Sequence, residues 1–387
     1  MIKRDEYLKK LIGFRDRQLI KVITGIRRCG KSTLLEIYRQ HLLSAGVSDG
    51  RIISINFEDM DNDHLRQPRE LHDHIVSRLD RDAMNYVFLD EVQAVEDFPR
   101  VVDSLFIKKN VDVYITGSNA YMLSEEIATL LSGRYVELSM LPLSFAEYVS
   151  SFGDRTDLSR RYSDYLRYSS FPYAVRLGAD ARMTKDYLGG IYNTVLLKDV
   201  VARKKISDVM TLESVIRFMA DGVGNLLSTK KIADTLTSSG RKISTHTVES
   251  YLSALTDSFV FYRARRYDIK GKQFLKTNEK YYIVDPGLRY YLLGSRGPDV
   301  GRMLENVVYL ELLRRGYGVY VGKLNGLEVD FVVTRGDVTE YYQVALTVRD
   351  RDTLERELLP LRKIADHNPK YVLTLDEDPP ASHNGIR

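Results

Sequence analysis

The apolar positions near the N-terminus follow two spacings. Short runs rich in Val, Ile, Phe and Tyr at 19–24, 86–89 and 111–115 are typical of buried strands, and a helical spacing follows the first of them. Strands that alternate with helices predict an α/β domain with a parallel sheet. We expect this domain at 1–150.

Beyond that point the alternation stops. Residues 155–227 place apolar side chains three or four positions apart, which predicts helices. Two helices with serine caps and two strand-like runs then follow one another, which is the order of a winged helix-turn-helix. The last part mixes both patterns and ends without a finished element, which indicates truncation. We expect a helical lid or connector at 151–227, a winged helix at 228–295 and a small α/β domain at 296–387.

Composition narrows the class of protein. The chain has 387 residues, of which 44% are apolar and 28% charged, as in an ordinary soluble globular protein of two or three domains. Its single cysteine, Cys29, allows no internal disulfide. No apolar run reaches the roughly 20 residues that span a bilayer, and the N-terminus lacks a signal-peptide pattern. A cytoplasmic location without a membrane partner is expected.

A glycine-rich segment joins the first predicted strand to the helix after it. It matches the pattern G-x-x-x-x-G-K-S, in which a loop before a helix N-terminus surrounds phosphates with backbone amides. Lys31 is expected to reach the β- and γ-phosphates, and Ser32 to bind Mg²⁺. The predicted nucleotide-site residues are Gly25, Arg27, Arg28, Cys29, Gly30, Lys31, Ser32 and Thr33.

Some residues of this segment have a second interpretation. Arg27 and Arg28 also fit solvated charges, and Thr33 fits a residue that supports the helix start. The small side chain of Cys29 also fits the loop without a further role. A thiol near Lys31 and a helix N-terminus is expected to have a lowered pKa. We hypothesise that alkylation of Cys29 blocks nucleotide binding.

Polar residues end the next two predicted strands. Asp90 and Glu91 follow an apolar run and belong at the sheet edge where ligands bind in parallel α/β folds. Asp90 is expected to orient the water shell of Mg²⁺, and Glu91 to polarise the water that attacks the γ-phosphate. One of Thr116, Ser118 and Asn119 is expected to hold that water; ordinary turn chemistry is the alternative.

Arg134 follows a predicted helix at 121–131 and precedes a strand-like run at 135–138. An arginine in this place can act as a finger toward the γ-phosphate of its own or a neighbouring subunit. The alternative is a surface arginine favoured by the dipole at a helix C-terminus. A homo-oligomer is a candidate assembly.

The net charge of +4 is unevenly distributed. Residues 203–280 hold 15 Lys and Arg against 8 Asp and Glu, and within 263–280 the count is seven to two. Such a cluster fits the phosphate backbone of DNA. The outward face of the second winged-helix helix lacks Arg and Lys, so sequence-specific base reading is not expected. The predicted DNA-binding residues are Arg263, Arg265, Arg266, Lys270 and Lys272; protein docking is the alternative.

The C-terminal part places carboxylates in the order of a restriction-type nuclease. Glu305 lies on a predicted helix and Asp330 on a strand, while Gln343 and Ala345 occupy the positions of the Glu-x-Lys that such sites carry on the next strand. Gln is a weak metal ligand, and Ala cannot replace a cation. A catalytically inactive nuclease-like scaffold is therefore expected, with an active metal-dependent nuclease as the alternative.

With these motifs the chain resembles the prokaryotic AAA-type ATPases that carry a C-terminal domain of restriction-endonuclease-like fold. The resemblance covers nearly the whole chain. It implies an ATPase core with ATP as the nucleotide, a winged helix, a nuclease-like tail, and Arg134 as a hydrolysis sensor or finger. The segments that carry the resemblance are 25–33, 56–59, 88–93, 115–119, 132–134, 142–145, 196–199, 247–252 and 304–306.

The expected activity is Mg²⁺-dependent ATP hydrolysis that drives a switch or small motor, with DNA as a candidate partner. The alternatives are a nucleotide-gated DNA- or protein-docking module with negligible turnover, and a metal-dependent nuclease.

Overall fold

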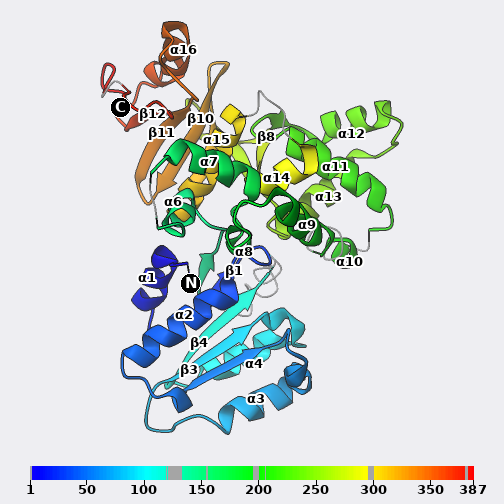
Figure 1. Ribbon diagram of the computed structural model, residues 1–387, viewed down its shortest axis with the longest axis vertical. Coiled ribbons are helices and arrows are strands. Elements are labelled where there is room, and N and C mark those ends of the chain that lie inside the picture. The colour runs from blue at the N-terminus through cyan, green and yellow to red at the C-terminus, as the bar shows by residue number, and fades with distance from the viewer. Residues whose placement is uncertain are drawn as a thin grey trace. The chain divides into compact units, whose positions relative to one another are not determined.

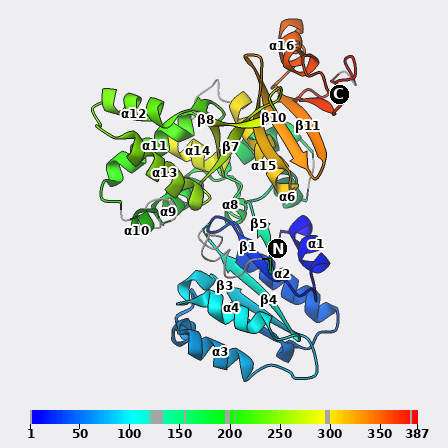
Figure 2. The ribbon, with the colours of Figure 1, turned by 180° about the vertical axis from the view of Figure 1, so that it is seen from behind.

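The computed structural model divides into two compact units (Figures 1 and 2). The first comprises Met1–Arg155, Phe171–Tyr173 and Asp257–Phe259, and the second Thr156–Ser170, Ala174–Thr256 and Val260–Arg387. The residues described are 2–118, 120, 133–153, 156–194, 200–204, 206–294, 300–379 and 382–387, without the side chains of 203, 204, 276 and 277. The predicted helix at 121–131 lies outside them.

A five-stranded parallel sheet forms the centre of the first unit, in the order β2-β3-β4-β1-β5. The α/β prediction with a parallel sheet is thus confirmed. The strands are β1 (Ile20–Thr24), β2 (Ile52–Asn56), β3 (Asn85–Asp90), β4 (Val111–Gly117) and β5 (Tyr135–Ser139). The helices are α1 (Asp5–Gly13), α2 (Lys31–Ser44), η1 (Asp49–Arg51), η2 (Met60–Arg66), α3 (Pro68–Val76), η3 (Val92–Ala94), α4 (Phe98–Phe106) and α6 (Phe145–Ser150).

Both faces of this sheet are covered, which explains why its strands read as continuous apolar runs. Val87 and Leu89 belong to one buried cluster with residues of α3 and α4. Phe88 points to the other face, because successive side chains of a strand alternate, and its ring lies against Tyr38 of α2.

One charged residue interrupts the apolar run of β1. The ammonium of Lys21 is fully buried and pairs with Asp112 of β4, and it donates to the carbonyl oxygen of Arg17 at 2.8 Å. Asp112 also accepts a 2.8 Å hydrogen bond from the hydroxyl of Tyr114. A buried charge is tolerated only when it is paired in this way.

The second unit contains a mixed sheet of seven strands in the order β12-β11-β10-β9-β7-β8-β6. These are β6 (Leu226–Leu227), β7 (Phe261–Asp268), β8 (Gln273–Ile283), β9 (Gly318–Leu324), β10 (Leu327–Arg335), β11 (Val338–Val344) and β12 (Lys370–Leu373). The remaining helices are α7 (Leu158–Tyr168), α8 (Pro172–Val175), α9 (Ala181–Ile191), α10 (Val200–Lys204), α11 (Val209–Asp221), α12 (Thr229–Ser238), α13 (Thr245–Asp257), α14 (Pro286–Leu293), α15 (Val300–Arg314) and α16 (Arg351–Arg362).

Two helices cover opposite faces of the C-terminal strands. Phe331 of β10 packs near Tyr309 of α15, with ring centroids 6.0 Å apart. The next residue along the strand, Val332, belongs to a buried cluster with Leu358 and Leu361 of α16. The alternation of β10 therefore gives this end of the sheet a helix on each side.

The elements expected of a winged helix occur in the predicted order. Ser228 caps α12 by accepting from the amide of Lys231, and Ser244 accepts from the amide of Thr247 at the start of α13. The strands β7 and β8 pair in antiparallel fashion, and β7 also pairs with β9 in parallel. The sheet therefore continues across the predicted boundary at 295/296. The winged-helix assignment and the four-part division remain predictions.

Within the described residues, no helix is both long and apolar enough to cross a membrane.

Candidate nucleotide site

The glycine-rich loop connects β1 to α2, as the sequence pattern requires. Gly25 has φ +148°, and a Cβ at this position would lie 2.2 Å from the carbonyl oxygen of Met140. Gly30 has φ +105° and directly precedes α2. Neither backbone position suits a residue with a side chain, so both glycines are needed for the path of the loop.

Lys31 is the first residue of α2, and its side chain is turned into the site. The ammonium lies 3.1 Å from the carbonyl oxygen of Gly25 and 3.5 Å from that of Ile26. It also forms an ion pair with Glu91, whose Oε1 is 3.1 Å away. Both side chains are buried. Their ion pair makes the predicted phosphate ligand, Lys31, and the predicted base, Glu91, direct partners.

Glu91 follows β3 in a left-handed backbone conformation with φ +55°. Its Oε2 accepts a hydrogen bond from Nε2 of Gln93 at 2.5 Å, and the same amide group lies 3.4 Å from the hydroxyl of Ser118. Burial by itself would raise the pKa of Glu91. The charge of Lys31 and the hydrogen bonds from Gln93 and Ser118 outweigh burial, and they hold the pKa below its usual value. Glu91 is therefore ionised at neutral pH.

Thr116 of β4 joins the two acidic residues. Its hydroxyl accepts from the backbone amide of Glu91 at 2.9 Å and donates to Oδ1 of Asp90 at 2.5 Å. Thr116 thus fixes both acids. Ser118 lies on the Glu91 side, next to Gln93. Asn119, the third candidate for holding the attacking water, lies outside the described residues.

The other predicted loop residues differ in exposure. Ser32 and Thr33 are exposed in the first turn of α2, beside Lys31. Arg27 forms an ion pair with Glu58 across 3.2 Å. Arg28 is exposed and has φ +65°.

Cys29 corrects one expectation. Its side chain is completely buried, and burial raises the pKa of the thiol, although Lys31 and Arg4 lower it. The predicted lowering of this pKa is wrong, because proximity to Lys31 does not compensate for the loss of water around a thiolate.

Arg134 lies away from the phosphate loop of its own chain. It immediately precedes β5, which begins opposite Ile20 at the start of β1, whereas the loop follows the far end of that strand. Its guanidinium pairs with Asp103 of α4 and lies over the ring of Phe106, 5.6 Å from the centroid. A finger toward its own site does not fit this position. A role toward a neighbouring subunit remains a prediction.

Arg4 was missed by the sequence analysis. Its buried guanidinium donates to the carbonyl oxygens of Cys29 at 3.0 Å and Leu141 at 2.6 Å, and it pairs with Glu147 at 3.0 Å. Arg4 thereby holds the loop against the segment that follows β5. No local pattern marks Arg4, because its partners lie 25, 137 and 143 residues away along the chain.

Comparison with known proteins agrees with this geometry. Residues 17–149 match the model of an AAA domain, and residues 159–299 match a domain of unknown function (DUF8612). An uncharacterized protein of Haemophilus influenzae is 41% identical over 97% of this chain and 93% of its own length. The chain belongs to the same family as this protein. An uncharacterized protein of Methanocaldococcus jannaschii is 29% identical over 89% of the chain and 78% of its own length.

Among solved structures, the Walker-type ATPase PABY2304 of Pyrococcus abyssi is similar to this chain. It has a TM-score of 0.51 and 16% identity, and the match covers 76% of this chain and 96% of that one. Residues 17–149 of the first unit thus match an AAA domain, and the unit has the fold of a P-loop core. The winged helix and the nuclease-like domain are not part of what these matches establish.

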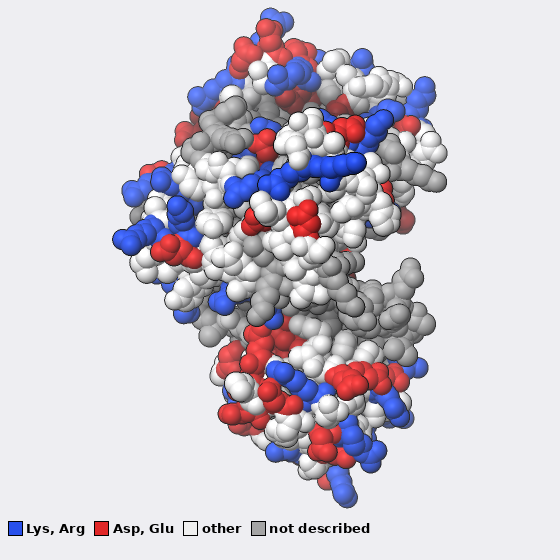
Figure 3. Space-filling model, turned by 90° about the vertical axis from the view of Figure 1, so that its right-hand side faces the viewer, with Lys and Arg blue, Asp and Glu red and all other residues white. Residues whose placement is uncertain are grey.

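In the second unit, the basic hairpin carries less exposed charge than the sequence count indicates. Arg265, Lys270 and Lys272 are exposed, Arg266 is half-buried, and Arg263 lies 3.7 Å from Glu279. Lys280 is buried and paired with acids. Figure 3 draws one face of the second unit, on which Lys and Arg side chains form a run.

The predicted nuclease-site residues do come together. Glu305 of α15 and Asp330 of β10 both lie beside the ammonium of Lys280, at 2.9 and 3.9 Å. Gln343 of β11 accepts from the amide of Asp330 at 2.8 Å. Burial and the charge of Glu305 raise the pKa of Asp330 to about 7, although Lys280 opposes this.

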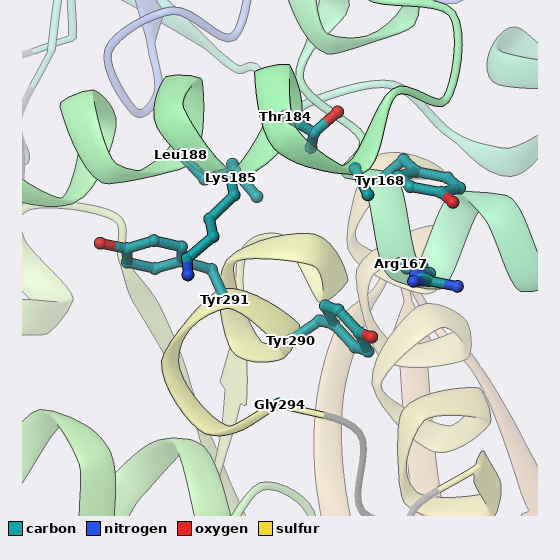
Figure 4. Close-up of a pocket in the computed structure, with 9 residues that line it drawn as sticks. Arg167, Tyr168, Thr184, Lys185, Leu188, Tyr290, Tyr291 and Gly294 are labelled. Carbon is teal, nitrogen blue, oxygen red and sulfur yellow. The ribbon is translucent and has the colours of Figure 1, made fainter.

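The second unit also holds a cavity of about 290 Å³ between α7, α9 and α14 (Figure 4). Tyr168, Tyr290 and Tyr291 line it, together with Arg167 and Lys185. The guanidinium of Arg167 lies over the rings of Tyr168 and Tyr290, 5.3 and 5.5 Å from their centroids. Among the described residues, the lining contains hydrogen-bond donors and no carboxylate, so its chemistry suits an anionic ligand better than a cationic one.

Proposed function

We propose that the AAA domain hydrolyses ATP with Mg²⁺ and uses the cycle as a conformational switch. The observation that carries this proposal is the contact of Lys31 with Glu91, because it brings a phosphate-binding cation and an ionised base to one point at the sheet edge. The residues fit a nucleotide. Two glycines shape the loop, and an ammonium rests on the carbonyl oxygens of Gly25 and Ile26.

The donor set also fits Mg²⁺. The hydroxyl of Ser32 and the carboxylate of Asp90 are the two oxygen groups that P-loop ATPases provide for this ion. Ser32 is exposed beside Lys31, while Asp90 is buried and held by Thr116. When bound, Mg²⁺ would neutralise charge on the β- and γ-phosphates.

Glu91 has the chemistry of the base. Its carboxylate, kept ionised by its neighbours, accepts a proton from water as that water attacks the γ-phosphorus and the bond to the leaving ADP oxygen breaks. Lys31 holds the phosphate oxygens during this step. Thr116 keeps the backbone of Glu91 and the side chain of Asp90 in fixed positions.

Steady-state turnover of Glu91→Gln tests the assignment. The variant keeps the size of the side chain but cannot accept the proton, so kcat should fall by about 10²-fold or more while ATP still binds. Glu36→Gln, on the exposed side of α2, is the matched control and should keep full turnover. Normal turnover of Glu91→Gln would refute the role of Glu91.

The rival function is a nucleotide-gated docking module with negligible turnover. Under this function, the ATPase rate of the wild-type protein would be as close to zero as that of Glu91→Gln, with and without DNA. DNA is the proposed partner because the hairpin β7–β8 exposes Arg265, Lys270 and Lys272 close together in sequence. ATPase rates measured against increasing DNA concentration separate the two functions.

A further inference from the structure

A buried ammonium group lies among the carboxylates where the nuclease resemblance leads one to expect a metal ion. Nζ of Lys280 is 2.9 Å from Oε1 of Glu305, 2.7 Å from Oε1 of Glu328 and 3.9 Å from Oδ1 of Asp330. The lysine side chain is only 3% exposed. It comes from β8, whereas the acids come from α15 and β10.

The acids also have other partners. The oxygen of Glu305 that faces Lys280 accepts a 2.7 Å hydrogen bond from the hydroxyl of Tyr282. The second oxygen of Asp330 accepts from the amide of Val344 at 2.9 Å. The carboxylates are thus held in place without a divalent ion.

Gln343 is bound at both ends of its amide. Its oxygen accepts from the backbone amide of Asp330 at 2.8 Å, and its nitrogen donates to Oε2 of Glu357 at 2.9 Å. A glutamate at this position would place a second carboxylate against Glu357. Gln343, which departs from the nuclease pattern, is therefore the residue whose oxygen and nitrogen both find hydrogen-bond partners here.

We propose that Lys280 is the permanent cation of this site and that the C-terminal sheet binds no divalent metal there. The ammonium satisfies Glu305, Glu328 and Asp330 at once, and it ties β8 to both α15 and β10. Within the described part of the chain, no group of three or more His, Cys, Asp and Glu side chains is arranged to hold a metal ion. The residues therefore do not fit the metal of a nuclease.

The proposal has a specific consequence. Removal of the ammonium leaves the three acids without a cation between them and allows their side chains to move closer together, and carboxylate oxygens that surround an ion bind Mg²⁺ and Mn²⁺. Lys280→Met, which keeps most of the apolar stem, should create a divalent-cation site. The inference is independent of ATP hydrolysis.

Titration of the full chain with Mn²⁺, with the free ion followed by electron paramagnetic resonance, tests both statements. Wild type and Asp330→Asn should bind the same amount of Mn²⁺. Lys280→Met should bind one ion more, and Lys280→Met/Asp330→Asn should lose it again. Lys323→Met, on the neighbouring strand β9, is the matched control and should gain nothing.

Two results would overturn the proposal. Loss of one bound Mn²⁺ in Asp330→Asn alone would mean that metal displaces Lys280 in the wild type. If folded Lys280→Met binds no more Mn²⁺ than the wild type, the ammonium of Lys280 does not take the place of a metal ion. If Lys280→Met fails to fold, the comparison of wild type with Asp330→Asn, and with the milder Glu328→Gln, still decides the first statement.

Discussion

Nζ of Lys31 lies 3.1 Å from Oε1 of Glu91, so the residue proposed to hold the phosphates is paired with the residue proposed to activate water. In the proposed function, the γ-phosphate and the carboxylate would compete for one buried ammonium. ATP binding would then weaken this ion pair and release Glu91 toward water when substrate arrives. The same contact would thus link nucleotide binding to the position of the proposed base.

Neutralising Glu91 should strengthen ATP binding. Glu91→Gln removes the competing charge, and we expect a few-fold to about tenfold lower Kd, corresponding to about 1 kcal/mol. Lys31→Met should raise the Kd for ATP by at least the same factor, because the phosphate-binding cation is lost. Titration with a fluorescent ATP analogue gives both values. Weaker binding by Glu91→Gln than by the control Glu36→Gln would contradict the competition.

Gln93 should set the acid side of the pH–rate profile. Its amide donates to Glu91 and lowers the pKa of that carboxylate. A base must be deprotonated to act, so a raised pKa in Gln93→Leu should move the acid limb of kcat toward higher pH. Gln40→Leu, whose amide donates to Glu36 on the surface of α2, is the control. An unchanged acid limb in Gln93→Leu would show that this hydrogen bond does not tune the base.

The residues of this site show what the sequence could predict. The sequence predicts that the loop, Lys31, Asp90 and Glu91 lie together, because each follows a strand end and strand ends meet along one edge of a parallel sheet. The structure places them together, and their roles stay predictions. Lys21, Arg4 and Lys280 were not found. Each is a charge whose partners lie distant in sequence, and the partner of Lys21 is 91 residues away. Only the folded chain reveals that such charges are buried.

The count of charges shows the same limit. Lys280 is counted among the cations of the basic segment 263–280, but its side chain is buried and forms ion pairs with three acids. Likewise the position of Cys29 beside Lys31 indicated a reactive thiol, while its complete burial has the opposite effect on its pKa. Sequence patterns show which residues are neighbours along the chain. The surface charge and the pKa of a side chain depend in addition on its exposure to solvent.

Cys29 should react slowly with alkylating reagents in the folded protein. The reactive species is the thiolate, and the raised pKa keeps it scarce at neutral pH, while burial blocks access. Because this is the chain's single cysteine, the thiol signal reports one site. We expect labelling by iodoacetamide to be at least tenfold faster in urea than in native buffer. Equal rates would mean that the thiol is exposed.

Arg4 should stabilise both the fold and the loop. Arg4→Met leaves Glu147 without its buried partner and two carbonyl oxygens without their donor, which should cost about 3 kcal/mol of unfolding free energy. ATP affinity should fall in parallel. Lys9→Met removes an exposed cation that pairs with Glu6, and its effect should stay within about 0.5 kcal/mol. Urea unfolding compares the two; similar midpoints would contradict the structural role of Arg4.

The prediction that the β7–β8 hairpin binds DNA can be tested by measuring how DNA affinity changes with salt concentration. If Arg265, Lys270 and Lys272 contact phosphates, each contact releases counterions and adds about 0.9 to the slope of log K against log salt. The triple Gln variant should therefore bind DNA more weakly and with a slope lower by about 2 to 3. The control changes three exposed cations of the first unit to Gln and alters the net charge equally: Arg69, Arg81 and Lys109.

Because both triple variants lose three positive charges, a general charge effect would flatten both slopes alike. A contact surface at the hairpin would flatten only the first. Fluorescence anisotropy of a labelled duplex between about 50 and 200 mM salt covers the range in which such slopes are large. An unchanged slope in the hairpin variant would discard DNA binding at β7–β8 and favour the protein-docking interpretation of this surface.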